Sequence, residues 1–375
     1  MLYQSARLVK VQNKPNSWRG VLSYKDASGK WRQKSKKLKA STESAAKREL
    51  TAWRASMEAE ADETISPSAS IDLSDYIDGY IDRIEAMESV SPTTIASYRN
   101  VARRVRRTLG PKRIDRFTRV DAEKWEASLV NEFASVTVIK CHRLVKMVLD
   151  QAVIEEVIRA NPLNGVKPPK KVAAHQGINA LDAKGRSRVV SILDPMVPSP
   201  MATAALISLF TGLRRGEICG LKWSDIDLKR GVMWVRRSIG EADGGNTYIK
   251  EPKTGESRDV AIPGRLAEVL KRRKAFQNSG CEWVVGDATF MKPHTLTREW
   301  GAIVKNYNIR GVEGRLCTFH DLRHTWATAA VAGGIDIKTV SSNLGHANAA
   351  MTLNIYASAD PDAKRRAAEK MNEII

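Results

Sequence analysis

The sequence lacks the features that mark several protein classes. Its longest apolar stretch, around Met201–Leu213, is shorter than the roughly 18–20 residues that cross a membrane, and Arg214 and Arg215 follow it. We therefore expect a buried helix there. The N-terminal residues contain no apolar core of a secretory signal. Neither a Walker A nor a GxGxxG motif is present, so no common nucleotide-binding site is indicated.

Cysteine is scarce, and its spacing excludes two further classes. The four cysteines lie far apart, with no CxxC pair. Such spacing fits neither a disulfide framework nor a zinc site, and it favours a reducing cytoplasm. We expect no metal site and no cofactor. The cysteines are Cys141, Cys219, Cys281 and Cys317.

Acidic residues are too few to balance the basic ones. The chain has 61 Lys and Arg against 42 Asp and Glu, a formal charge of +19, and 42% hydrophobic residues. That hydrophobic content is enough for a packed core and excludes wholesale disorder. The charge favours a polyanionic partner, nucleic acid first and an anionic membrane second. The first 40 residues alone contain eleven basic residues and one acidic residue.

Two breaks in the pattern predict three domains. Residues 66–70 form a short polar linker, and residues 161–177 are rich in Pro, Gly and Lys without periodicity. The predicted domains are 1–65, 66–165 and 181–375, with 166–180 as a linker. The predicted fold class is a multidomain, mostly helical protein with small β elements.

The N-terminal block is predicted to be a small sheet with one helix. Strands at 18–24 and 30–38 flank a turn-forming cluster, and a helix follows over 41–60. Because side chains alternate along a strand, Arg32, Lys34 and Lys36 share one face. We interpret that basic face as a DNA contact. The alternative is an edge strand that carries lysine to prevent aggregation.

Residues 71–160 are predicted to form four helices, because apolar residues recur at helical spacing. On the second helix Arg99, Arg103 and Arg106 lie mostly off the apolar stripe. These arginines fit a DNA-binding surface and an ordinary solvated helix face equally well.

The C-terminal block is predicted to be mostly helical around one small β region. Strands are expected at Val232–Ile239, Tyr248–Lys250 and Arg258–Ile262, and the last two are expected to form a hairpin around a Pro-Lys-Thr-Gly turn at 252–255. Four polar clusters stand out, and each taken singly has an ordinary structural explanation. They are Arg214 with Glu217, Lys253 in the turn, His320-x-x-Arg323, and Leu-Gly-His346 with Tyr356 ten positions later.

Together and in this order, the clusters resemble the tyrosine recombinase (phage integrase) family. The resemblance spans about residues 180–360, at the level of motifs. It implies a mixed α+β catalytic domain over 181–375. Residues 66–165 look like the family's helical, SAM-like core-binding domain. Residues 1–65 look like the three-stranded arm-binding domain of integrases from conjugative transposons and some temperate phages.

The resemblance also implies a metal-free and ATP-free cleavage of DNA. Tyr356 would attack the phosphodiester and form a 3′-phosphotyrosine. His320 would accept its proton. Arg214 and Arg323 would bind the two non-bridging oxygens, which suits a forked and permanently charged guanidinium.

Three further residues receive roles from the same resemblance. Lys253 would protonate the departing 5′ oxygen, because an ammonium can release a proton where a guanidinium cannot. His346 would donate another hydrogen bond to the phosphate. Glu217 would orient the arginine and histidine side chains.

The function that follows is site-specific integration and excision of a mobile genetic element by a DNA-bound tetramer in the bacterial cytoplasm. Expected partners are double-stranded DNA at core and arm sites, an excisionase and a host DNA-bending protein, and no membrane. One alternative is a type IB topoisomerase-like or chromosome-dimer-resolving enzyme. A second is a catalytically silent DNA-binding regulator. Residues 357–375 are expected to form a helix from about Pro361, which docks either on a neighbouring subunit or on its own domain.

The excess of positive charge predicts a strong salt dependence of DNA binding. Six to ten phosphate contacts would lower the affinity by about 10³–10⁵ between 50 and 200 mM salt, because neutralised phosphates release counterions. Fluorescence anisotropy with a labelled duplex measures the dissociation constant across that range. A log–log plot without a steep slope would contradict the prediction.

Overall fold

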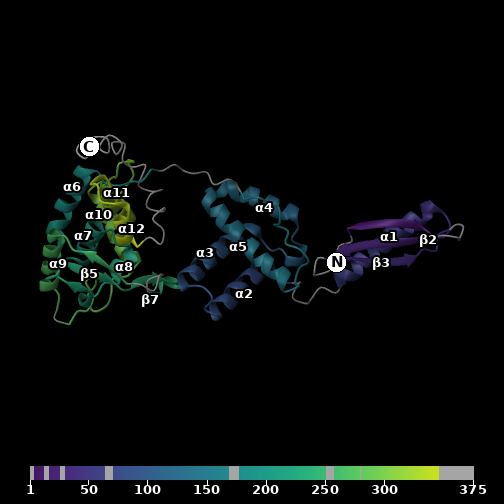
Figure 1. Cartoon of the computed structure of the whole chain (residues 1–375), viewed down its shortest axis with the longest axis horizontal. Helices are drawn as coiled ribbons and strands as arrows, with labels where there is room; N and C mark the ends of the chain where they lie inside the picture. Colours follow the sequence, from purple (N-terminus) through teal and green to yellow (C-terminus); the bar gives the residue numbers. More distant parts are fainter. Residues whose placement is uncertain are drawn as a thin grey trace, which may run out of the picture. The chain divides into compact units, whose positions relative to one another are not determined.

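Figure 1 shows the computed structural model of the 375-residue chain. It describes residues 4–11, 17–25, 30–63, 71–168, 177–250, 257–278 and 280–345. The chain divides into two compact units, residues 1–90 with 97–172, and residues 91–96 with 173–375. The expected turn around Lys253 and the expected C-terminal helix lie outside the described residues.

The N-terminal part is a three-stranded antiparallel sheet with one helix, as predicted (Figure 1). The strands are β1 (Ser5–Lys10), β2 (Trp18–Lys25) and β3 (Trp31–Lys37), with β2 in the centre, and α1 (Glu43–Glu63) packs against β1 and β2. Leu22 and Leu50 lie in the core between sheet and helix. A Cβ on Gly20 would lie 2.7 Å from Leu50, so the helix approaches the sheet at this glycine.

The next part contains the four predicted helices. They are α2 (Leu73–Ala86), α3 (Pro92–Leu109), α4 (Arg119–Glu132) and α5 (Ser135–Ile154), with a 3₁₀ turn at Ile114–Arg116. Helix α4 begins with a reciprocal capping box between Thr118 and Asp121, as its sequence indicates. A continuous apolar side of α5 is buried. Helix packing therefore holds this part together.

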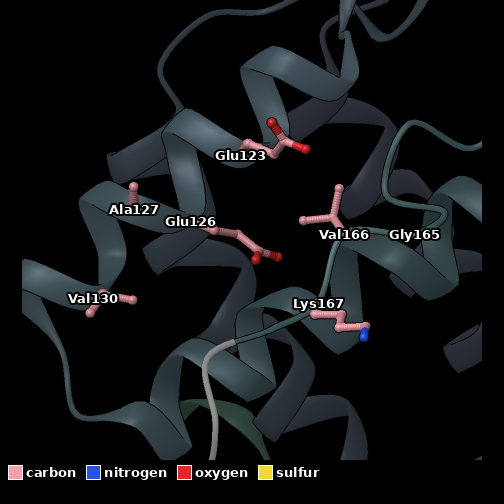
Figure 2. A pocket seen from close by; sticks show the side chains of 7 residues that line it. All are labelled: Glu123, Glu126, Ala127, Val130, Gly165, Val166 and Lys167. Atoms are coloured by element: carbon pink, nitrogen blue, oxygen red, sulfur yellow. The ribbon is translucent and has the colours of Figure 1, made fainter.

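A pocket of about 450 Å³ opens between α4 and the segment that follows α5 (Figure 2). Beside it the carboxylate of Glu126, on α4, binds Nδ1 of His142, on α5. Both side chains are almost fully buried, so each gives the other a hydrogen-bond partner inside the bundle.

The C-terminal unit is built around one buried helix, as predicted. Helix α7 (Pro200–Thr211) contacts five other helices, and nearly every residue in it is buried. These five are α6 (Ala183–Leu193), α8 (Arg215–Cys219), α9 (Gly264–Phe276), α10 (Pro293–Asn306) and α11 (Phe319–Ala332). Helix α12 (Ile337–Leu344) packs against α11. Short 3₁₀ turns lie at Asp194–Met196, Trp223–Asp225 and Asp243–Gly245.

The strands of this unit pair differently from the sequence prediction. Strands β4 (Ile226–Asp227), β5 (Val232–Val235) and β8 (Arg258–Ala261) form one sheet, and β6 (Ser238–Glu241) and β7 (Thr247–Lys250) form a separate hairpin. The predicted strand 232–239 is thus two strands, and β8 pairs with β5 rather than with β7. The reason is core burial. Met233 pairs with Val260, and both are almost fully buried.

No helix in the described parts of the chain is long and apolar enough to span a membrane.

Candidate active site

The first site segment is the sharp turn between α7 and α8. Gly212 ends α7 in the left-handed conformation, at φ 71°. A Cβ at this position would lie 2.7 Å from Trp326 and 3.0 Å from Leu344, so both the backbone and the packing require glycine. The turn places Arg214 at the N-cap position of α8 and leaves its side chain 42% exposed.

Glu217 is the buried carboxylate of the site and lies between two arginines. It is 7% exposed. Its Oε1 accepts from Arg214 Nη1 at 2.9 Å, and its two oxygens accept from Arg258 Nη1 and Nη2 at 3.1 and 2.7 Å. Burial alone would raise the pKa of Glu217. The hydrogen bonds and charge of Arg258, with the charge of Arg214, outweigh burial and hold that pKa below its usual value.

Helix α11 supplies the histidine and the second arginine of the predicted site. Thr318 and Asp321 form a capping box that fixes the first turn, where His320 lies. Arg323 is buried, 3% exposed. Its Nη1 donates to the carbonyl of Gly212 and its Nη2 to that of Leu344, both at 2.7 Å. Arg323 therefore ties the end of α7 to the end of α12.

His320 lies at the surface of the site with its ring 4.6 Å from the ring of His324. Partial desolvation, followed by the positive charge of Arg323, lowers the pKa of His320, while Asp321 opposes the shift. Burial and the neighbouring His320 lower the pKa of His324 to about 4. Both imidazoles are therefore neutral at pH 7, the form in which a histidine can accept a proton.

Helix α12 ends beside these groups, at Gly345. That residue is left-handed, at φ 61°, and its carbonyl accepts from Arg214 Nη2 at 2.9 Å. The structure thus brings Arg214, Glu217 and Arg323 together at the ends of α7, α11 and α12, with His320 on the same turn as Arg323. Lys253, His346 and Tyr356 lie outside the described residues.

The sequence prediction omits Arg258. The structure shows why a second arginine is needed, because a buried carboxylate requires close countercharge and several donors, and Arg214 is 42% exposed. Nothing in the spacing of residues 217 and 258 shows that they meet.

The predicted basic face of the N-terminal sheet lies on the side of α1. In the register, Lys34 pairs with Leu22 and Lys36 with Gly20, and both of these β2 residues face the helix. Arg32 shares that side. Lys36 lies over the ring of Trp53 on α1, 5.9 Å from its centroid. The face opposite α1 instead carries a different basic set, namely Arg7, Arg19 and Lys37.

Two of the three predicted DNA-contacting arginines on α3 form ion pairs with α2. Arg99 Nη2 contacts Asp82 at 3.0 Å and also binds Glu85. Arg106 Nη2 contacts Asp75 and Asp78 at 2.7 and 2.6 Å. Arg103 is exposed. The pairs give Arg99 and Arg106 a role within the helical part, and their contact with DNA stays a prediction.

In the portions of the chain that the structure covers, no three His, Cys, Asp or Glu side chains gather in a way that could hold a metal ion.

Comparison with known proteins places the chain in a family. The model of the phage integrase family matches residues 181–362. A protein named tyrosine recombinase XerC-like, from Caldanaerobacter subterraneus, is 30% identical over 64% of this chain and 67% of its own length. The transposase of transposon Tn916 from Enterococcus faecalis is 28% identical over 71% of this chain and 69% of its own length. The chain belongs to the phage integrase family of tyrosine recombinases, enzymes that break and rejoin DNA in site-specific recombination.

Solved structures show the same fold. The Tn1549 transposon integrase in complex with transposon right end DNA aligns over 80% of this chain and all of its own, with a TM-score of 0.66 and 23% identity. A lambda integrase dimer bound to a core site aligns over 93% of this chain and 96% of its own, with a TM-score of 0.62 and 19% identity. The multidomain, mostly helical fold predicted from the sequence is thereby confirmed.

The buried carboxylate predicts a pH-dependent contribution to stability. Because the folded state lowers the pKa of Glu217, its contribution is present above the unfolded pKa of 4.5 and is lost as pH falls through the folded value. We expect Glu217→Gln to destabilise the fold by about 3–5 kcal/mol at pH 7, since it leaves Arg258 buried without its countercharge. The difference from wild type should shrink below about pH 4.5. Urea unfolding at several pH values measures it.

The matched control is Glu268→Gln, which removes an exposed carboxylate that pairs with Lys271 on α9. Its effect should stay under about 1 kcal/mol, because exposed ion pairs contribute little. Equal losses for Glu217→Gln and Glu268→Gln would refute the role given to burial.

Proposed function

We propose that this chain is the integrase of a mobile genetic element and acts through the residues gathered at the ends of α7, α11 and α12. The observation that carries the proposal is the meeting of Arg214, at the start of α8, with His320 and Arg323, which lie on α11 more than 100 positions later in the sequence. Two guanidinium groups beside a neutral imidazole form a suitable site for a phosphodiester and a proton acceptor.

In the proposed mechanism, Tyr356 attacks the scissile phosphorus and forms a 3′-phosphotyrosine, while the 5′ oxygen departs. His320 takes the phenolic proton, and Lys253 gives a proton to the departing oxygen. Arg214 and Arg323 stabilise the charge on the non-bridging oxygens, and His346 adds a hydrogen bond. Removing one such electrostatic donor typically lowers a rate by about 10²–10³.

Rejoining follows from the same intermediate. The 5′ hydroxyl of another strand attacks the phosphotyrosine, releases Tyr356 and restores a phosphodiester. The number of phosphoester bonds is conserved in the two steps, so the reaction needs no ATP.

The assembly we propose is a tetramer on DNA. Lambda integrase has been solved as a tetramer bound to a Holliday junction, with the same fold as this chain. Residues 1–65 would bind arm sites, residues 66–165 core sites, and residues 181–375 would carry out the chemistry, with 166–180 as the linker. An excisionase and a host DNA-bending protein would set the direction of the reaction, in the bacterial cytoplasm.

A second candidate is a chromosome-dimer-resolving recombinase. The 30% identity to a XerC-like recombinase favours it. The sheet and helix at residues 4–63 favour an integrase, since housekeeping resolvases of this family generally lack an arm-binding domain.

The nucleophile assignment predicts a covalent complex that depends on Tyr356. With a nicked suicide duplex that spans the end of the element, the wild type should give a protein–DNA band under denaturing conditions, because the freed strand diffuses away and prevents rejoining. Tyr356→Phe lacks the phenolic oxygen and should give none. A covalent band from Tyr356→Phe would show that another residue attacks the phosphate.

The two basic faces of the N-terminal sheet provide a matched test of arm-site binding. We expect the face opposite α1, which carries Arg7, Arg19 and Lys37, to enter the major groove, which admits β-strands. Arg7→Ala, Arg19→Ala and Lys37→Ala together should weaken arm-site binding. Arg32→Ala, Lys34→Ala and Lys36→Ala remove the same charge from the helix side and should weaken it less. Gel shifts with arm-site and core-site duplexes measure the affinity of both triple variants. A larger loss of arm-site affinity in the Arg32, Lys34 and Lys36 variant would assign the DNA contact to the face that carries α1.

A further inference from the structure

The end of α12 is held by three arginines, one for each of its last three carbonyls. Arg258 Nε donates to the carbonyl of Asn343 at 2.9 Å. As described above, Arg323 binds the carbonyl of Leu344 and Arg214 that of Gly345. Carbonyls at the end of a helix have no partner within the helix and carry partial negative charge, so cations stabilise them. Two of the three arginines are the proposed phosphate ligands, and Arg258 has no assigned role.

Arg258 is built into this site rather than lying over it. Its side chain is 17% exposed, and it pairs with both oxygens of the buried Glu217. A Cβ on Gly345 would lie 2.8 Å from Arg258 Nη1 and 3.0 Å from its Cζ. Gly345, the glycine of the Leu-Gly-His motif, is therefore required for two reasons. Its φ is positive, and the guanidinium of Arg258 leaves no room for a Cβ.

The place of Arg258 in the chain links three parts of the site. It is the first residue of β8, five positions after Lys253 in the sequence. Its Nε reaches the helix that leads to His346, and its Nη atoms reach the carboxylate that also binds Arg214.

Glu217 is shared, so the two arginines that bind it are coupled. With Arg258 present, the carboxylate distributes its charge between two guanidinium groups. Without Arg258, the buried charge of Glu217 would be balanced by Arg214 alone and would draw it away from a phosphate. The end of α12 would lose its bond at Asn343 at the same time.

We propose that Arg258 is a positioning residue of the recombination reaction. It sets the end of α12 and the carboxylate of Glu217, so that Arg214 is held in place for the phosphate, and it does not itself touch DNA. The proposal rests on the function proposed above.

The test compares Arg258→Ala and Arg258→Lys with a matched control, Arg237→Ala. Arg237 has a side chain 20% exposed, pairs with the buried Asp225, and donates to the carbonyl of Gly220 at 3.2 Å. It therefore resembles Arg258 in burial and bonding but contacts none of the site residues described above. The measurements are the melting temperature, the dissociation constant for a core-site duplex, and the single-turnover rate of covalent complex formation on the suicide duplex at saturating protein.

We expect Arg258→Ala to lower the single-turnover rate by about 10²-fold, because small misplacements of reacting groups have effects of that size. The dissociation constant should change less than the rate does. Arg237→Ala should lower the melting temperature comparably and leave the rate nearly unchanged. Arg258→Lys keeps the charge but not the forked donors, so it should restore stability more than rate.

Three results would overturn the proposal. Equal losses of rate in Arg258→Ala and Arg237→Ala would mean that Arg258 acts only through stability. Weaker DNA binding with a normal rate at saturation would make Arg258 a DNA contact. A wild-type single-turnover rate in Arg258→Lys would show that the positive charge alone is enough and that the forked donors are not needed. If Arg258→Ala does not fold, the rate of Arg258→Lys alone tests the proposal. A wild type without any covalent complex would instead overturn the proposed function, and the role of Arg258 with it.

Discussion

The candidate site depends on one buried carboxylate that two guanidinium groups share. Glu217 stays ionised inside the protein because Arg214 and Arg258 supply charge and donors. Three arginines gather at the end of α12 and only two of them bind this carboxylate, so the site keeps a positive excess even after the partial negative charge of the helix end is counted. Burial first, and then the charge of Arg323 and Arg214, lowers the pKa of His320. The same positive excess is the field that an approaching phosphate meets.

The sequence predicts the parts of the site that depend on local pattern. The unbroken apolar stretch before Arg214 can only be a buried helix, and α7 is that helix. The spacing of His320 and Arg323 places both in the first turns of α11. The contact between Arg258 and the carbonyl of Asn343 joins residues 85 positions apart. No periodicity encodes such a contact, because it arises when β8 pairs with β5 and brings Arg258 to the helix end.

Total charge predicts the kind of partner but not the residues that meet it. On α3, Arg99 and Arg106 bind carboxylates of α2, so part of their charge is used inside the protein. On the N-terminal sheet, the alternation of side chains correctly groups Lys34 with Lys36. Which side the helix covers is decided by Leu22 and Gly20 on the neighbouring strand, through a register that the sequence leaves open.

The arginines of the site already donate hydrogen bonds to backbone carbonyls in the protein without DNA, and this has a consequence for catalysis. A guanidinium that already donates to a helix end cannot rotate freely, so it needs little reorganisation when charge develops on the phosphate. Arg214 combines such an anchor with a side chain 42% exposed, and its five N–H groups allow both. Lysine has a single flexible ammonium and cannot bind Glu217 and a carbonyl in one rigid plane. The same argument requires arginine at position 258, because one guanidinium there donates three directed hydrogen bonds, one to the carbonyl of Asn343 and two to Glu217.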